Sequence, residues 1–126
     1  MIPVRWEEIA ELELGVLEGG GAGSVVTGVK ADSREVGSGD LFVGLNTGVR
    51  FVGEARARGA ATLVPDDQEE ALAALASLVR SKSEAHVVAI VGSAGKTTTK
   101  DILGALCAPH APTISGPLRH DARRER

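Results

Sequence analysis

The segment Gly92-Ser93-Ala94-Gly95-Lys96-Thr97-Thr98 has the residue types and spacing best suited to chemistry in this chain. Glycines let a backbone curl so that successive N–H groups point inward, and a helix that begins beside them adds the positive end of its dipole. Lys96 supplies a mobile charge for the β- and γ-phosphates of a nucleotide, and the Thr97 hydroxyl is placed to ligate the Mg²⁺ that bridges them. The segment therefore predicts a phosphate-binding loop for a nucleotide and its Mg²⁺.

The neighbouring patterns are those that such a loop requires. Residues 86–91 (HVVAIV) form a continuous apolar run, which predicts a parallel strand buried on both faces. A helical pattern follows the loop, and it predicts that Ile102, Leu103 and Leu106 face inward. The spacing is G-x-x-G-K-T-T rather than G-x-x-x-x-G-K-[ST], because Ile90 stands where the first glycine is expected. The alternative is an ordinary strand-to-helix turn with an exposed lysine.

Upstream patterns predict a separate small α/β module. They indicate helices over residues 5–14, 51–58 and 68–80, and strands over 25–29, 41–45 and 60–64. Asp66 and Asp67 are expected to cap the last helix, and Leu72, Leu75, Leu78 and Val79 to share its buried face. Residues 19–23 (GGGAG) break regular structure and could form either a substrate loop or a flexible turn. The polar residues 80–85 predict a domain boundary.

Composition limits the possible partners and the cellular setting. The 126 residues carry a net charge of −3, which disfavours nucleic acid or an anionic membrane surface as the main partner. No apolar run approaches the roughly 18–20 residues that cross a bilayer. The single Cys107, expected to be a small core filler, and the lack of a secretion signal at the start predict a reducing, cytoplasmic location. The spacing of His86, His110 and His120 does not suggest a metal site.

Two segments together resemble a known family. Residues 92–101 (GSAGKTTTKD) resemble the ATP loop of the Mur ligases, the cytoplasmic enzymes that add amino acids to the peptidoglycan precursor. The Thr-Lys-acid continuation is most similar to the branch that joins D-alanyl-D-alanine to UDP-N-acetylmuramoyl-tripeptide, whereas MurE-type ligases share the glycine spacing. Residues 32–45 (DSREVGSGDLFVGL) look like the part of the small N-terminal domain that receives the UDP-sugar.

The upstream resemblance assigns roles to two residues. It implies that Ser33 and Arg34 lie near the uridine diphosphate group, where a hydroxyl and a fixed cation suit uracil and phosphate oxygens. The alternative is a turn that carries a solvated salt bridge. The sequence also departs from the family after Leu45, where residues 46–51 (NTGVRF) are shorter than the usual glycine-rich loop.

The resemblance covers about residues 1–114 and implies an α/β fold with three parts. Residues 1–82 would be the mixed α/β, UDP-sugar-binding N-terminal domain of a Mur ligase. Residues 83–118 would be the first strand, phosphate loop and helix of its central ATP-binding domain, which is truncated. Residues 119–126 would be a basic tail outside the family pattern, either an anion-binding segment or out-of-family translated sequence.

The implied activity is that of an ATP- and Mg²⁺-dependent ligase, in which residues 92–98 bind ATP and Lys96 is the catalytic residue. Such an enzyme activates the carboxylate of UDP-N-acetylmuramoyl-peptide as an acyl phosphate, and it serves peptidoglycan synthesis and thereby cell wall biogenesis, cell shape and cell division. Because the downstream parts of the family are absent from the sequence, the isolated chain is expected to be inactive. The alternatives are a non-catalytic module that binds UDP-sugar or nucleotide, a MurE-type fragment, and an aggregation-prone half-domain with exposed strand edges.

Overall fold

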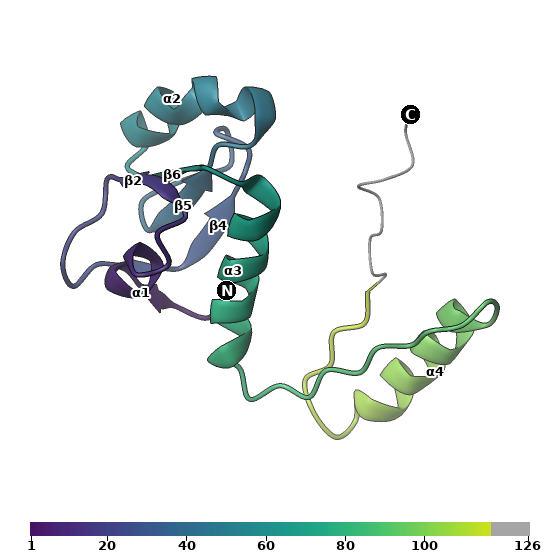
Figure 1. Cartoon of the computed structure of the whole chain (residues 1–126). Helices are drawn as coiled ribbons and strands as arrows, with labels where there is room; N and C mark the ends of the chain where they lie inside the picture. The colour runs from purple at the N-terminus through teal and green to yellow at the C-terminus, as the bar shows by residue number, and fades with distance from the viewer. Residues whose placement is uncertain (117–126) are drawn as a thin grey trace. The chain divides into compact units, whose positions relative to one another are not determined.

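A computed structural model of the chain describes residues 1–116. The chain divides into two compact units, Met1–Glu84 and Ala85–Arg126, and each is treated by itself below (Figure 1). The expected basic tail, residues 119–126, and His120 within it lie outside the described residues. Among the described residues, no helix is long and apolar enough to cross a membrane.

The first unit is built on a mixed four-stranded sheet in the order β2-β6-β5-β4 (Figure 1). Strands β4 (Gly28–Lys30), β5 (Asp40–Val43) and β6 (Ala61–Pro65) are parallel, and β2 (Gly15–Glu18) is antiparallel to β6. A separate antiparallel pair joins β1 (Val4–Arg5) to β3 (Val25–Val26). The helices of this unit are α1 (Trp6–Ala10), the 3₁₀ helix η1 (Asn46–Phe51), α2 (Val52–Ala57) and α3 (Gln68–Ser81).

Side chains of β5 supply the core on both faces of this sheet. Leu41 and Val43 belong to one apolar cluster, together with Leu75 of α3. Phe42, which lies between them in the strand, belongs to a second cluster with Ala55 of α2. Successive residues of a strand point to opposite faces, so α2 and α3 cover opposite faces of the sheet. The mixed α/β class that the sequence predicts is thus confirmed for this unit.

Helix α3 follows its predicted bounds closely. Asp67 is its N-cap, and the Glu70 N–H donates to the Asp67 carboxylate at 2.8 Å. Leu75 is buried as expected, but Leu72 is 43% exposed and Ala71 is fully buried in its place. Residues four apart share a helix face, so the buried stripe that contains Leu75 includes position 71 and leaves position 72 to one side.

Two upstream predictions differ from the structure because distant residues decide them. The helix expected over 5–14 ends at Ala10, and β2 begins five residues later and pairs with β6. Gly15 has a φ of +147°, and a Cβ there would collide with the Val64 carbonyl oxygen of that partner strand. The strand expected over 25–29 is interrupted at Thr27, so that β3 and β4 join different sheets.

The described part of the second unit contains one helix, α4 (Lys96–Cys107). The strand predicted over 86–91 is not formed, and the prediction was wrong: Val87 and Val88 are each 68% exposed. A strand requires a hydrogen-bonded neighbour, and no described strand pairs with this segment. Ile102 and Leu106 are likewise exposed rather than inward. Cys107 is exposed and is not a core filler, because no residue from 85 to 116 is buried.

Candidate functional site

The predicted phosphate loop leads directly into the first turn of α4. Gly95 is the N-cap of this helix in the left-handed conformation, with φ 75° and ψ 4°, which glycine adopts without strain. The Thr99 N–H donates to the Gly95 carbonyl at 2.9 Å. The amides of Lys96, Thr97 and Thr98 precede this bond, and such first-turn amides have no acceptor within the helix. The loop therefore ends at a group of N–H donors suited to an anion.

The Lys96 side chain folds back across the loop. Its Nζ donates to the carbonyl of Gly92, so the ammonium lies over the segment where the resemblance expects phosphate oxygens. Ser93, Ala94, Thr97 and Thr98 are exposed. A polyphosphate could therefore reach the loop, although Lys96 would first have to exchange the Gly92 carbonyl for a phosphate oxygen.

The metal assignment rests on Thr97 alone. Within residues 1–116, no three His, Cys, Asp or Glu side chains gather where they could hold a metal ion. A single hydroxyl ligand fits Mg²⁺, because this ion usually keeps several waters and takes further oxygens from substrate phosphates. The residues present thus suit a magnesium ion that arrives with a nucleotide.

Ser33 and Arg34 lie in the turn that follows β4. Ser33 is buried at 6% exposure, whereas the Arg34 side chain is 79% exposed. Arg34 Nε and Nη2 donate to the two carboxylate oxygens of Asp32 at 2.9 and 2.6 Å. This guanidinium lowers the pKa of Asp32 from 3.8 to about 2, and the backbone N–H of Arg34 adds to the effect. The turn contains the solvated ion pair foreseen as the alternative, so the charge of Arg34 is already balanced by Asp32.

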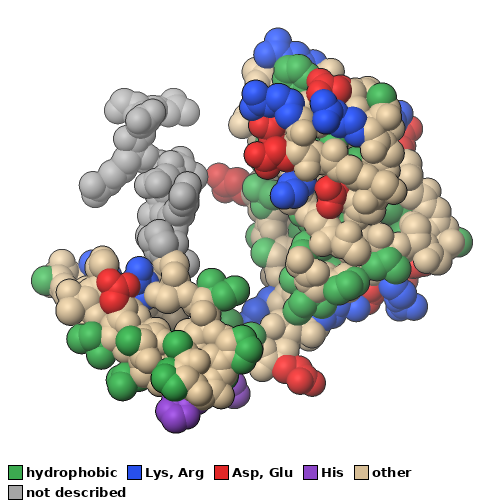
Figure 2. Space-filling view, turned by 180° about the vertical axis from the view of Figure 1, so that it is seen from behind, with side chains coloured by type: hydrophobic (Ala, Val, Ile, Leu, Met, Phe, Trp, Pro, Cys, Tyr) green, Lys and Arg blue, Asp and Glu red, His purple; other side chains and the backbone are tan. Residues whose placement is uncertain are grey.

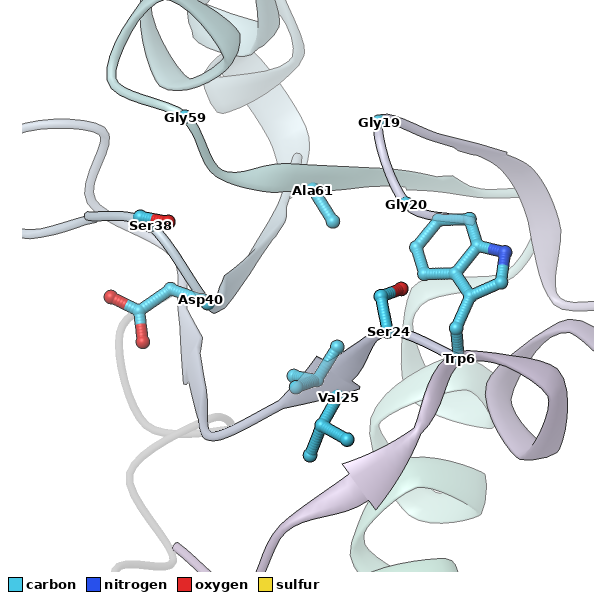
Figure 3. Close-up of a pocket in the computed structure, with 11 residues that line it drawn as sticks. Trp6, Gly19, Gly20, Ser24, Val25, Ser38, Asp40, Gly59 and Ala61 are labelled. Carbon is cyan, nitrogen blue, oxygen red and sulfur yellow. The ribbon is translucent and has the colours of Figure 1, made fainter. Parts of the chain in front are cut away.

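A pocket of about 270 Å³ opens elsewhere on the first unit, at the amino ends of β5 and β6 (Figure 3). Trp6 lines it, with its ring against Gly20, and Ser38, Asp40 and Ala61 complete much of the wall. Sequence reasoning missed this pocket because its residues come from segments far apart in the chain. The glycine run 19–23, which contributes two lining residues, was the one local signal.

The glycine run is a turn closed by hydrogen bonds. Ser24 Oγ donates to the Gly21 carbonyl at 2.7 Å, and the Gly23 N–H donates to Glu7 Oε1 at 2.6 Å. The bond from Gly23 lowers the pKa of Glu7 below its ordinary value. Residues 19–23 therefore form a turn that is fixed by hydrogen bonds at the rim of the pocket.

Comparison with known proteins identifies the class. No protein-family profile matches the chain. The chain is 34% identical to UDP-N-acetylmuramoyl-L-alanyl-D-glutamate–2,6-diaminopimelate ligase of Syntrophomonas wolfei, over 64% of this chain and 21% of that enzyme. It is 35% identical to the chloroplastic MurE homologue of Arabidopsis thaliana, over 64% of this chain and 13% of that protein. Together with a 31% identity to a third Mur ligase over 96% of the chain, these similarities show that the chain belongs to the Mur ligase family.

Within this family, the chain is similar to MurF over most of its length. It is 31% identical to UDP-N-acetylmuramoyl-tripeptide–D-alanyl-D-alanine ligase of Escherichia coli, over 96% of this chain and 30% of that enzyme. Two solved structures from Acinetobacter baumannii, one of UDP-N-acetylmuramoylalanyl-D-glutamyl-2,6-diaminopimelate–D-alanyl-D-alanyl ligase and one of MurF, match with a TM-score of 0.72. The identities are 28% and 27%, over 89% of this chain and 29% of each. The chain thus spans less than a third of the length of the relatives it matches.

Proposed function

We propose that the chain is the N-terminal part of a MurF-type ligase. In this proposal, residues 1–82 bind the UDP-sugar end of UDP-N-acetylmuramoyl-tripeptide, and residues 83–118 begin the ATP-binding domain. The observation that carries it is the occurrence of both motifs, 32–45 and 92–101, in a chain similar to MurF over 96% of its length. The complete enzyme would join D-alanyl-D-alanine to the tripeptide through an acyl phosphate, in the cytoplasm.

The proposed roles follow from the chemistry of the loop. The amides of residues 92–98 and the N-terminus of α4 bind phosphate oxygens, and Lys96 balances charge on the phosphoryl group that is transferred. Thr97 contributes a hydroxyl to Mg²⁺. ATP with its Mg²⁺ would supply the phosphoryl group that activates the substrate carboxylate. The exposed position of the loop, with Lys96 Nζ over its first residue, supports these roles.

Calorimetric titration of ATP·Mg²⁺ into the wild type and a Lys96→Ala variant tests the nucleotide site. Removal of a phosphate-contacting charge should weaken binding by about 1.5–3 kcal/mol. Lys100→Ala is the matched control, because Lys100 lies on the same helix and pairs with Asp101 at 3.1 Å. Equal affinities of wild type and Lys96→Ala would refute the role of Lys96. No binding by either would reject a working nucleotide site in the isolated chain.

A non-catalytic binding module is the second candidate function. The observation in its favour is that the first unit has its own buried core, whereas no residue from 85 to 116 is buried. In either case we expect no D-alanyl-D-alanine-dependent phosphate release from the 126-residue chain alone, since it spans 30% of the E. coli enzyme. Measurable release of this kind would contradict the non-catalytic candidate and the expected inactivity of the 126-residue chain.

A further inference from the structure

A second arginine lies over the turn that contains Ser33 and Arg34. Arg58 is the C-cap residue of α2, and its Nη1 donates to the Arg34 carbonyl oxygen at 3.3 Å. Its Nη2 contacts Glu54 Oε1 at 3.4 Å. Figure 2 shows basic and acidic side chains interleaved at the end of the first unit that carries α2. The turn after β4 and the end of α2 therefore form one charged surface.

The two arginines differ in how firmly acidic partners hold them. Arg34 makes two short bonds to both oxygens of Asp32, the strong form of a guanidinium–carboxylate pair. Arg58 makes one long contact to Glu54, between side chains that are 45% and 42% exposed. Exposed pairs of this kind contribute little to stability. An anion can thus engage Arg58 at low cost, whereas engaging Arg34 requires it to displace a well-held carboxylate.

We propose that Arg58 is the cation that contacts the diphosphate, while Arg34 stays paired with Asp32 and holds the turn beside Ser33. This inference rests on the UDP-sugar site proposed above. The charge of Arg58 already acts on this turn, since it contributes to the lowered pKa of Asp32. Sequence reasoning could not single out Arg58, because it lies 24 positions from Arg34 and no local pattern separates it from its neighbours.

Titration of UDP and of uridine, which lacks the diphosphate, tests this assignment. The proteins compared are the 126-residue wild type, Arg58→Ala, Arg34→Ala and the charge-matched control Arg80→Ala on α3. Arg58→Ala should weaken UDP binding about tenfold, leave uridine binding unchanged, and reduce the salt dependence of UDP binding. Arg80→Ala should change neither affinity, and Arg34→Ala should weaken UDP less than Arg58→Ala does. Arg58→Lys keeps the charge if the alanine variant folds poorly, and it should bind UDP more tightly than Arg58→Ala.

Two results would overturn the inference alone: UDP affinities that are equal in Arg58→Ala and Arg80→Ala, or an equal loss of UDP and uridine binding in Arg58→Ala. The second result would mean that Arg58 supports the turn through the Arg34 carbonyl and does not contact phosphate. A wild type that binds neither UDP nor uridine would instead remove the proposed UDP-sugar site, and this inference with it.

Discussion

Replacement of Phe42 by alanine tests whether the first unit is stabilised by its own core. Phe42 is fully buried and packs in a cluster with Val36, Ala55 and Ala60. A buried aromatic side chain covers about 150–250 Å², which at ~25 cal/mol per Å² corresponds to about 4–6 kcal/mol of transfer free energy. Measured Phe→Ala changes in cores cost about 3–5 kcal/mol. A unit of this size has a free energy of unfolding of only about 4–12 kcal/mol, so Phe42→Ala should remove a large part of it.

Urea denaturation followed by tryptophan fluorescence measures this loss in the first unit. The chain has one tryptophan, Trp6, and it lies in that unit. Phe42→Leu preserves most of the volume and should cost less than about 1.5 kcal/mol. Leu106→Ala on α4, where the side chain is 65% exposed, should stay within about 0.5 kcal/mol of the wild type.

The reasoning would be refuted by either of two results. An unchanged midpoint in Phe42→Ala would mean that the second cluster does not stabilise the unit. An equal effect of Leu106→Ala and Phe42→Ala on Trp6 fluorescence would mean that α4 contributes to the stability of the first unit as much as the buried core does.

Two further substitutions test the turns of the first unit. Gly20→Ala should destabilise this unit by about 1–3 kcal/mol, because a Cβ there would collide with the Trp6 ring. A Cβ at Gly21 meets no atom within 4 Å, so Gly21→Ala should be neutral in the same urea titration. Equal effects of the two substitutions would contradict the packing of Trp6 on Gly20. Asp32→Asn should lower the melting temperature above pH 4, and progressively less as the pH falls toward 2. The reason is that a carboxylate with a lowered pKa stabilises the fold at pH values above its ordinary pKa and loses this contribution when it is protonated. A difference in melting temperature that is independent of pH would show that the Asp32–Arg34 pair does not stabilise the fold.

Local signals predicted those elements whose determinants lie within a few residues of one another. Helix α3 has its cap, Asp67, and its apolar stripe within a single stretch, so its bounds followed from the sequence. Strand β2 could not be found in this way, because it depends on pairing with residues about fifty positions away. The segment 86–91 shows the converse error: its apolar composition suits a buried strand, but no described neighbour pairs with it.

The candidate functional residues also differ in whether their partners lie close to them in the sequence. The residues of the loop around Lys96 are contiguous in the sequence, so the loop could be recognised as a candidate phosphate-binding loop. Its nucleotide role stays a prediction. Arg58 and the pocket beside Trp6 depend on chain segments that meet only after folding. The Asp32–Arg34 pair lies between these cases, because its partners are two residues apart and the salt bridge was foreseen as an alternative.

The exposed thiol of Cys107 has a practical consequence. The chain contains one tryptophan and one cysteine, and the two residues lie in different units. A maleimide dye on Cys107 would therefore label only α4, while Trp6 would serve as an intrinsic energy donor in the first unit. The natural sequence thus already provides a donor and an attachment point, so that the distance between the two units can be measured with and without nucleotide, without any engineered substitution.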